Sequence, residues 1–440
     1  MRKKRAGQRR IKPLPVGRAC YTLKRKIFHR SNHERVPVKK ETIAVGRPSL
    51  LRRTNALTIL KLLREAGSCS RADLVRASGM SAPTVTNVVS DLLAANLIKP
   101  LGEGESSGGR PPDMIRFKAE RGCILGVRIS ASTLSFLLTD LSGDEMDATQ
   151  VPLKGRKTAP EAICGLIAEE TRRLLKQHKK AREQLLALVV GVPAITNVDE
   201  GVVMSISTLE EWRSIPLRRL LSRHVDCLVI IENDTNLSAL GERYRGAART
   251  EQTFILIDIG ANVSAGIVLE GKLHHGAQWS AGEIAYLRLP HIMRRQPALH
   301  QFGELESVLT DSGILKSWRD SIAKAGPTAL PDGKRMDAAG VLNLARAGDA
   351  RAKKIVLHRA GIVADVIVNL SLVLNPGLIL LGGDVGSHPA LLSFVKKDLE
   401  QSEFAIPRIA AASLGEFAVL WGAIALALES IPALLLPPSL

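Results

Sequence analysis

The sequence of 440 residues has few cysteines and no uninterrupted apolar run of membrane-spanning length. Its five cysteines are far apart: Cys20, Cys69, Cys123, Cys164 and Cys227. This spacing argues against a disulfide framework or a zinc cluster and is typical of a reducing cytoplasm. Glu429, Ser430 and Pro432 interrupt the most apolar stretch, Phe417–Leu436, which is therefore predicted to be a buried terminal helix. No apolar core follows the basic N-terminus, so we expect no signal peptide and no membrane partner.

Acidic residues are scarce at the N-terminus. Residues 1–47 contain sixteen Lys and Arg but only Glu34 and Glu41, and supply most of the net charge of +18. Because this segment lacks apolar periodicity, residues 1–48 are predicted to form a basic, disordered tail. Such a tail would add salt-sensitive affinity for DNA of any sequence. A solvated extension, or a start codon assigned too far upstream, explains it equally well, and a cleaved transit peptide is a more distant alternative.

Ser81–Leu93 is predicted to form a DNA-recognition helix. Its apolar residues have helical spacing and define one face: Val85, Val88, Val89 and Leu92. The other face carries short, mostly uncharged polar side chains: Ser81, Thr84, Thr86, Asn87 and Ser90. Such side chains suit close approach to base edges and phosphates in a major groove. We expect them to contact DNA together with Arg71, which opens the preceding helix.

The flanking sequence predicts a winged helix-turn-helix over residues 49–118. Asn55–Ala66 is predicted to be the first helix, and residues 70–80 a shorter one with Ser70 as its N-cap and Gly79 in the turn. Two strands, Leu97–Leu101 and Met114–Phe117, are predicted to follow.

The loop between these strands would be a wing. Its GGRPP core places Gly109 and Arg110 in a Pro/Gly frame suited to a minor groove. The alternative is a three-helix packing module with a flexible hairpin. The agreement of three helices, wing and basic charge favours DNA binding.

After residue 118, strand hairpins followed by helices occur twice, which predicts two α/β lobes with a cleft between them. Lobe one is expected over about 119–245 plus a last helix from Ala418 to Glu429, and lobe two over about 246–417. The predicted strands are Cys123–Ile129, Leu134–Asp140, Leu186–Val192, Val202–Met204, Leu228–Ile231, Thr253–Ile259, Ala265–Leu269 and Leu378–Leu381. The predicted helices are Pro160–Gln177, Leu237–Arg245, Glu304–Leu315, Arg335–Ala347 and Ala350–Leu374.

Several motifs in this region, in order, resemble those of the ROK family (repressor, open reading frame, kinase). LVIIENDTNLSAL at 228–240 resembles the family's strand ending in E-N-D-A-N, and IDIGANVSAGIVLEG at 257–271 resembles its second phosphate hairpin. KLHHGAQWSAGEIAY at 272–286 resembles the motif containing A-G-E-x-G-H. The resemblance covers about Leu51 to Ala427 and implies a two-lobed, actin-like (RNase H-like ATPase) fold. With the winged helix-turn-helix, it implies a sugar-responsive transcriptional repressor that binds a double-stranded DNA operator as a homodimer or homotetramer.

The resemblance also implies an effector pocket for a sugar or sugar phosphate. In the family's kinases the Asp of E-N-D takes the proton from a sugar hydroxyl, and the matching residue here is Asp234. Glu283, in the A-G-E motif, would accept hydrogen bonds from sugar hydroxyls. The other implied contacts are Thr208, Asn233, Tyr286 and Glu306. Asp234 could instead serve only as a helix N-cap.

The kinase hairpin D-x-G-G-T-K differs here. Its matching stretch is RISASTL at 128–134, so Arg128 replaces the acid, and Ser130 and Ala131 replace the glycines. We therefore expect no cofactor and no kinase activity. The zinc motif is absent, and His291 and His300 have no cysteine partners, so no metal site is predicted. Two alternatives stay open: a sugar kinase fused to a DNA-binding domain, which Asp234 favours, and an effector-independent DNA-binding protein.

Overall fold

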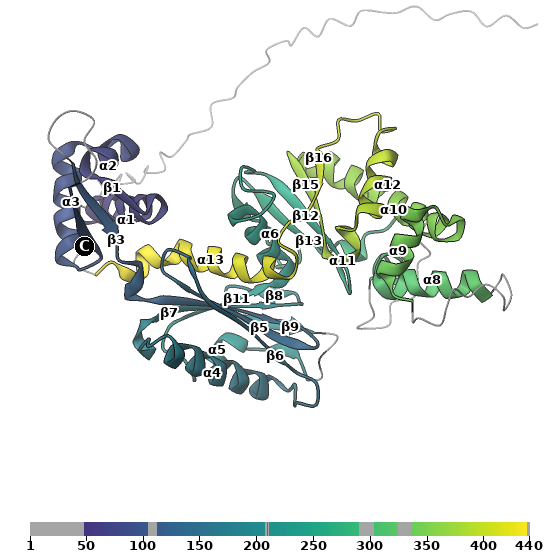
Figure 1. The fold of residues 1–440 in the computed structure, drawn as a ribbon, viewed down its shortest axis with the longest axis horizontal. Coiled ribbons are helices and arrows are strands. Elements are labelled where there is room, and N and C mark those ends of the chain that lie inside the picture. The colour runs from purple at the N-terminus through teal and green to yellow at the C-terminus, as the bar shows by residue number, and fades with distance from the viewer. Residues whose placement is uncertain are drawn as a thin grey trace, which may run out of the picture. The chain divides into compact units, whose positions relative to one another are not determined.

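The structure is a computed structural model that describes residues 48–103, 112–206, 209, 211–289, 303–323 and 336–437 (Figure 1). Five positions named in the sequence analysis lie outside the described residues: Thr208, Gly109, Arg110, His291 and His300. The predicted tail lies outside them as well, apart from Pro48.

The first described module has three helices and a small sheet, as the sequence predicts. Its helices are α1 (Pro48–Ala66), α2 (Arg71–Ser78) and α3 (Ala82–Ala94), and its strands are β1 (Ser68–Ser70), β2 (Ile98–Glu103) and β3 (Asp113–Phe117). The strand order is β1-β3-β2, and β2 and β3 form the antiparallel hairpin of the wing. The predicted start of α1 at Asn55 is wrong, because the helix already begins at Pro48.

Local capping explains why the three helices begin and end where they do. Ser70 caps α2 through a capping box in which the Ser70 and Asp73 side chains accept each other's backbone N–H. Gly79, with φ 68°, ends α2 in the left-handed conformation that glycine tolerates. Ser81 caps α3, whose buried residues are Val85, Val88, Val89 and Leu92, as predicted.

Lobe one, as we use the term, is built on a five-stranded sheet of order β11-β7-β4-β5-β6. Its strands are β4 (Cys123–Ile129), β5 (Thr133–Asp140), β6 (Glu145–Pro152), β7 (Leu185–Val192) and β11 (Leu228–Asn233). The helices α4 (Pro160–Gln177) and α5 (Leu217–Leu221) share an apolar core with one face of this sheet. A smaller sheet of order β10-β9-β8 joins it: β8 (Thr196–Asn197), β9 (Val202–Ser205) and β10 (Arg213–Ile215).

Lobe two contains a second five-stranded sheet of order β14-β13-β12-β15-β16. Its strands are β12 (Phe254–Ile259), β13 (Val263–Leu269), β14 (Lys272–Leu273), β15 (Leu378–Gly382) and β16 (Arg408–Ala411). Its longer helices are α8 (Asp311–Ala323), α9 (Ala338–Ala347), α10 (Ala350–Leu374) and α12 (Pro389–Leu399). A short helix, α11 (Gly383–Gly386), follows β15.

The predicted single helix Glu304–Leu315 is wrong. The chain instead forms α7 (Glu306–Leu309) and α8, separated by Thr310 in an extended conformation. The Thr310 hydroxyl donates to the Glu306 carbonyl at 2.6 Å, so this polar side chain satisfies the end of α7 locally.

Two helices lie between the sheets and cross each other closely: α6 (Asp234–Tyr244) and α13 (Ala418–Leu435) (Figure 1). A Cβ atom on Gly241 would lie 2.1 Å from the carbonyl oxygen of Ala418, and one on Gly422 would lie 1.7 Å from that of Leu237. Only glycine permits this backbone contact. Two predicted helix bounds are wrong. The helix α6 begins at Asp234 rather than at Leu237, and α13 continues past Glu429 and Pro432 to Leu435.

By length and composition alone, α10 and residues 415–435 could cross a bilayer. Half of the most apolar window of α10, and 61% of that of the terminal helix, is buried within the fold. The apolar character of α13 is used in packing, because it shares one core with α6, the first sheet and the helix-turn-helix.

The last turns of α13 are bound by α1. Arg64 donates to the carbonyl of Leu428, and Arg53 donates to the carbonyls of Ala433 and Pro437, each at 3.2 Å. Pro432 has no N–H to donate to the Leu428 carbonyl, and Ala433 is among the last four residues of α13, whose carbonyls have no partner within the helix. The two arginines of α1 satisfy carbonyls in this region and join the helix-turn-helix to lobe one.

We expect Gly422→Ala to destabilise the protein by about 1–3 kcal/mol, because the added methyl group meets backbone rather than a flexible side chain. Gly165→Ala, in the interior of α4, is the matched control, since nothing lies within 4 Å of its added Cβ. The control should be neutral or stabilising by up to about 1 kcal/mol. Urea unfolding measures both, and equal effects would contradict the close crossing.

Candidate functional site

The polar face of α3 lies as the sequence predicts. Ser81, Thr86, Asn87 and Ser90 are exposed and Thr84 is partly exposed. Some of these groups are already used within the helix: the Ser81 hydroxyl caps Thr84, and the Ser90 hydroxyl donates to the Thr86 carbonyl at 2.9 Å. Within the described residues, the Asn87 amide makes no hydrogen bond. It therefore keeps both donors and its acceptor for an external partner.

Arg71 opens α2 on the side of the wing. It is half-buried, and its guanidinium lies 3.9 Å from the carboxylate of Asp113, which begins β3. The long side chain is thus held beside the base of the wing. Its predicted role in DNA contact stays a prediction.

A second group of predicted residues surrounds one cavity of about 280 Å³ between the two lobes. The described effector-pocket residues all line it: Asn233, Asp234, Glu283, Tyr286 and Glu306. The structure adds lining residues that the sequence analysis did not assign to this pocket, above all Arg128 from β4 and Asp258 from β12. Asp258 lies within the IDIGAN motif, and this motif is the feature of the sequence that could have assigned Asp258 to the pocket.

The strand β11 delivers Asn233 and Asp234 to this cavity. Asn233 is the N-cap of α6: its Oδ1 accepts from the N–H groups of Thr235 at 2.9 Å and Asn236 at 3.1 Å. Its Nδ2 donates to the Ala194 carbonyl at 3.1 Å. The alternative in which Asp234 is the N-cap is therefore wrong. Because Asn233 fills that role, the carboxylate of Asp234 is left on the cavity wall.

The electrostatics of this wall centre on Arg128. Burial raises the pKa of Asp234 to about 7, with Asp258 adding to the effect and Arg128 opposing it. Burial likewise raises the pKa of Asp258 to about 6, again opposed by Arg128. The Nε of Arg128 is buried and has no hydrogen-bond partner among the described residues. Both carboxyl groups therefore titrate near neutral pH, and the positive charge of the Arg128 guanidinium offsets part of their negative charge.

The opposite wall is acidic as well. Glu306 accepts from the N–H of Gly303 at 2.8 Å and of Val263 at 3.3 Å, and burial raises its pKa. Burial raises the pKa of Glu283, with the neighbouring Glu306 adding to it. Tyr286 is 62% exposed at the rim. Carboxylates on both walls are suited to accept hydrogen bonds from the hydroxyl groups of a polyol.

The turn between β4 and β5 contains the stretch whose sequence resembles the kinase phosphate hairpin. The Ser130 hydroxyl accepts from the N–H of Thr133 at 3.0 Å and of Ser132 at 3.4 Å. The Ser130 N–H itself donates to the Thr133 carbonyl at 3.0 Å. These three N–H groups are satisfied within the turn, so they are not presented to a phosphate.

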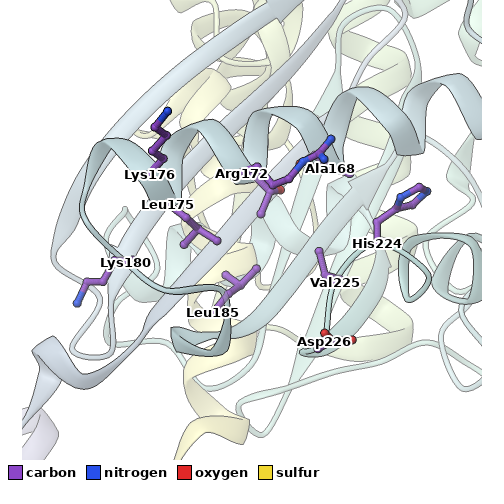
Figure 2. Close-up of a pocket in the computed structure, with 10 residues that line it drawn as sticks. Ala168, Arg172, Leu175, Lys176, Lys180, Leu185, His224, Val225 and Asp226 are labelled. Carbon is purple, nitrogen blue, oxygen red and sulfur yellow. The ribbon is translucent and has the colours of Figure 1, made fainter.

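A separate cavity of about 310 Å³ lies in lobe one, between the C-terminal half of α4 and the segment before β11. Figure 2 shows its apolar residues Leu175, Leu185 and Val225 beside basic side chains. Arg172 donates to the Ala168 carbonyl at 3.2 Å and Lys180 to the Glu120 carbonyl at 2.5 Å. These cations thus support the local fold, and the cavity contains no predicted site residue.

Comparison with known proteins places this geometry in context. A model described as the ROK family matches residues 124–430, and one described as a winged helix-turn-helix DNA-binding domain matches residues 52–99. The chain is 29% identical to a glucokinase of Halalkalibacterium halodurans, over 65% of this chain and 87% of the relative. It is 22% identical to a xylose repressor of Caldicellulosiruptor bescii, over 88% of this chain and 98% of the relative.

The fold is also similar to the crystal structure of a ROK family transcriptional regulator described as a homologue of the Escherichia coli Mlc protein. The TM-score is 0.74 at 21% identity, and the match covers 88% of this chain and 98% of that chain. The predicted fold class is therefore confirmed.

Asp234→Asn should change the pH dependence of stability. Because the folded-state pKa of Asp234 lies above its ordinary value of 3.8, the contribution of Asp234 to the free energy of unfolding should fall as the pH rises from about 4 to about 7. The variant cannot titrate there, so its stability relative to the wild type should increase between pH 4 and 8. Urea unfolding across this range measures the difference. Asp320→Asn, on the exposed side of α8, is the matched control. A constant difference between wild type and Asp234→Asn would contradict the raised pKa.

Proposed function

The chain belongs to the ROK family, and from this premise we propose that it is a cytoplasmic, sequence-specific DNA-binding regulator that represses genes of carbohydrate metabolism. Its effector is a sugar or a sugar phosphate. The observation that carries this proposal is that one chain combines the exposed polar face of α3 with a cavity walled by Asp234, Glu283 and Glu306. The names of several relatives, such as xylose repressor, support it.

In this proposal α3 enters the major groove of an operator. Thr86 and Asn87 face the base edges, and Arg71 with the wing holds the backbone or the neighbouring minor groove. A homodimer or homotetramer presents two such helices to half-sites about one helical turn apart. The basic N-terminal segment adds affinity that depends on salt but not on sequence.

The coupling between effector and DNA follows a continuous packed path. Asp234 is the first residue of α6, and α6 contacts α13 through Gly241 and Gly422. The last turns of α13 are bound by Arg53 and Arg64 of α1. A ligand that prefers a closed arrangement of the lobes would therefore displace α6 and α13 together. That displacement changes the position of the helix-turn-helix and hence its fit to the operator.

The second candidate is a sugar kinase, favoured by Asp234 and by the glucokinase relative. We propose that the chain is not a kinase. Phosphoryl transfer depends on positioning the phosphates of ATP, whereas Ser130 satisfies the turn that would hold them and Arg128 stands where the motif has an acid.

We expect no ATP turnover above background with D-glucose, D-xylose or N-acetyl-D-glucosamine. A coupled ADP assay on the wild type and Asp234→Asn measures this, and the two should give the same background rate. A wild-type rate that the substitution abolishes would establish the kinase instead.

The experiment that tests the proposed function is selection of genomic fragments by the full chain at about 150 mM salt, where nonspecific electrostatic binding is weakened. We expect a few recurrent, roughly palindromic sites. Asn87→Ala should lower affinity for those sites by about 5-fold to 150-fold, as the loss of one base contact of about 1–3 kcal/mol implies. Its affinity for random DNA should stay unchanged.

Asn369→Ala, the same substitution on the exposed side of α10, is the matched control and should leave both affinities unchanged. Diffuse retention of fragments that disappears as salt rises would overturn the proposal of sequence-specific binding. An equal loss on specific and random DNA would show that Asn87 does not contact bases.

A further inference from the structure

Glu232 and His275 form a pair that joins the two lobes behind the cavity. Glu232 lies on β11 of lobe one, and His275 follows β14 of lobe two. The His275 Nε2 and the Glu232 Oε2 are 2.8 Å apart. Neither side chain is among those that line the cavity. Any effect of this pair on a ligand must therefore act through other residues.

The Glu232 side chain is fixed on the side of lobe one. It is only 3% exposed, and its Oε1 accepts from the Asn233 N–H at 2.8 Å and from the Asn236 Nδ2 at 3.0 Å. Both donors belong to the segment that holds Asp234 at the start of α6. A displacement of Glu232 would thus move the wall on which Asp234 lies.

His275 occupies the corresponding position on the side of lobe two. Its carbonyl accepts from the N–H of Ala281 at 3.1 Å. The carbonyl of Gly282, the residue after Ala281, accepts from the N–H of Ala265 at 2.8 Å. His275 therefore anchors the beginning of the loop that ends in Glu283. One hydrogen-bonded pair connects the supports of Asp234 and Glu283, which lie on opposite lobes.

We propose that His275 is a positioning residue of the effector pocket: through Glu232 it holds the Glu283 loop of lobe two against the Asp234 segment of lobe one, more strongly when its imidazole is protonated. This inference rests on the proposed function, since the cavity that His275 would help to close is the proposed effector pocket. It makes the closure of the pocket depend on pH.

The charges around His275 determine the direction of that dependence. Two carboxylates of lobe one act on His275 and favour its charged form. They are Glu232 on β11 and Asp199 in the turn before β9. The Glu232 hydrogen bond raises the pKa of His275 above 6.5, while burial opposes the rise. The additional attraction between the lobes is therefore complete below pH 6.5 and is lost as the pH rises through the raised pKa. Above it, a neutral hydrogen bond remains.

A second inter-lobe contact gives a reference that does not titrate. The hydroxyls of Thr235 on α6 and Ser264 on β13 are 2.6 Å apart. This contact is unaffected by pH over the range in which His275 changes charge. Asp234 and Asp258 at the cavity also titrate near neutral pH. The His275 variants leave both carboxyl groups in place, so they identify the part of a pH-dependent change that belongs to the His275–Glu232 pair.

The test measures the distance between the lobes in the full chain, without sugar or DNA. Paired fluorophores are attached at Lys154→Cys in lobe one and Lys397→Cys in lobe two, both exposed. Cys20 and Cys227 are replaced by Ser, and Cys69, Cys123 and Cys164 are buried. We expect a short, narrow distance distribution at pH 6 that becomes longer or broader by pH 9.

Three variants make the test specific. His275→Gln should show the pH 9 distribution of the wild type at both pH values. His275→Lys should restore the short distance and remove the pH response, because a lysine with a pKa near 10.4 stays charged throughout. His178→Gln is the matched control: His178 pairs with Asp147 at 2.9 Å, but both residues belong to lobe one. It should behave as the wild type.

The inference is overturned if His275→Gln matches the wild type at pH 6, or if His275→Lys keeps the wild-type pH response. Because no ligand is used, neither result depends on whether the chain binds sugar. Absence of operator sites in the fragment selection would instead overturn the proposed function while leaving the distance measurement valid.

Discussion

The close crossing of α6 and α13 is the constraint on which the rest of the molecule depends. Two helices can approach to backbone contact only where side chains are absent, and Gly241 and Gly422 provide that condition. The crossing fixes the start of α6, and hence Asp234, relative to both sheets. It also fixes the direction in which α13 continues towards α1. The sugar-binding and DNA-binding proposals thus share one rigid contact.

In the proposed function, the cavity keeps a carboxylate at the position of the kinase base without the means to hold a nucleotide. Asp234 remains at the start of α6, and the cation that acts on its carboxylate is Arg128 of the protein itself. The Ser130 turn satisfies its own backbone donors. A carboxylate that binds a hydroxyl reversibly is sufficient for a sensor, whereas a kinase must also hold a nucleotide. The same fold can therefore support either task, and we propose that the difference lies in a few side chains at one turn.

Sequence reasoning succeeded where the signal is local. The buried and polar faces of α3, the caps Ser70 and Ser81, and most strands of both sheets follow from periodicity and capping. It failed for β6, an edge strand with no buried residue, because period-two hydrophobicity is absent there. It also missed the pair Glu232–His275 and the proximity of Arg128 to Asp258. These contacts join residues far apart in sequence, and no local pattern encodes them. The full length of α13 does not follow from the sequence, because a proline favours the end of a helix, whereas here another helix supplies partners for the carbonyls near Pro432.

The contact between α1 and α13 has a consequence for the synthesis of the protein. The helix-turn-helix is translated before α13, yet one part of its surface is completed by that later helix. Until α13 arrives, the apolar surface of α1 that it covers and the two arginines that bind its carbonyls face solvent. The helix-turn-helix therefore reaches its final arrangement only after both lobes have been translated.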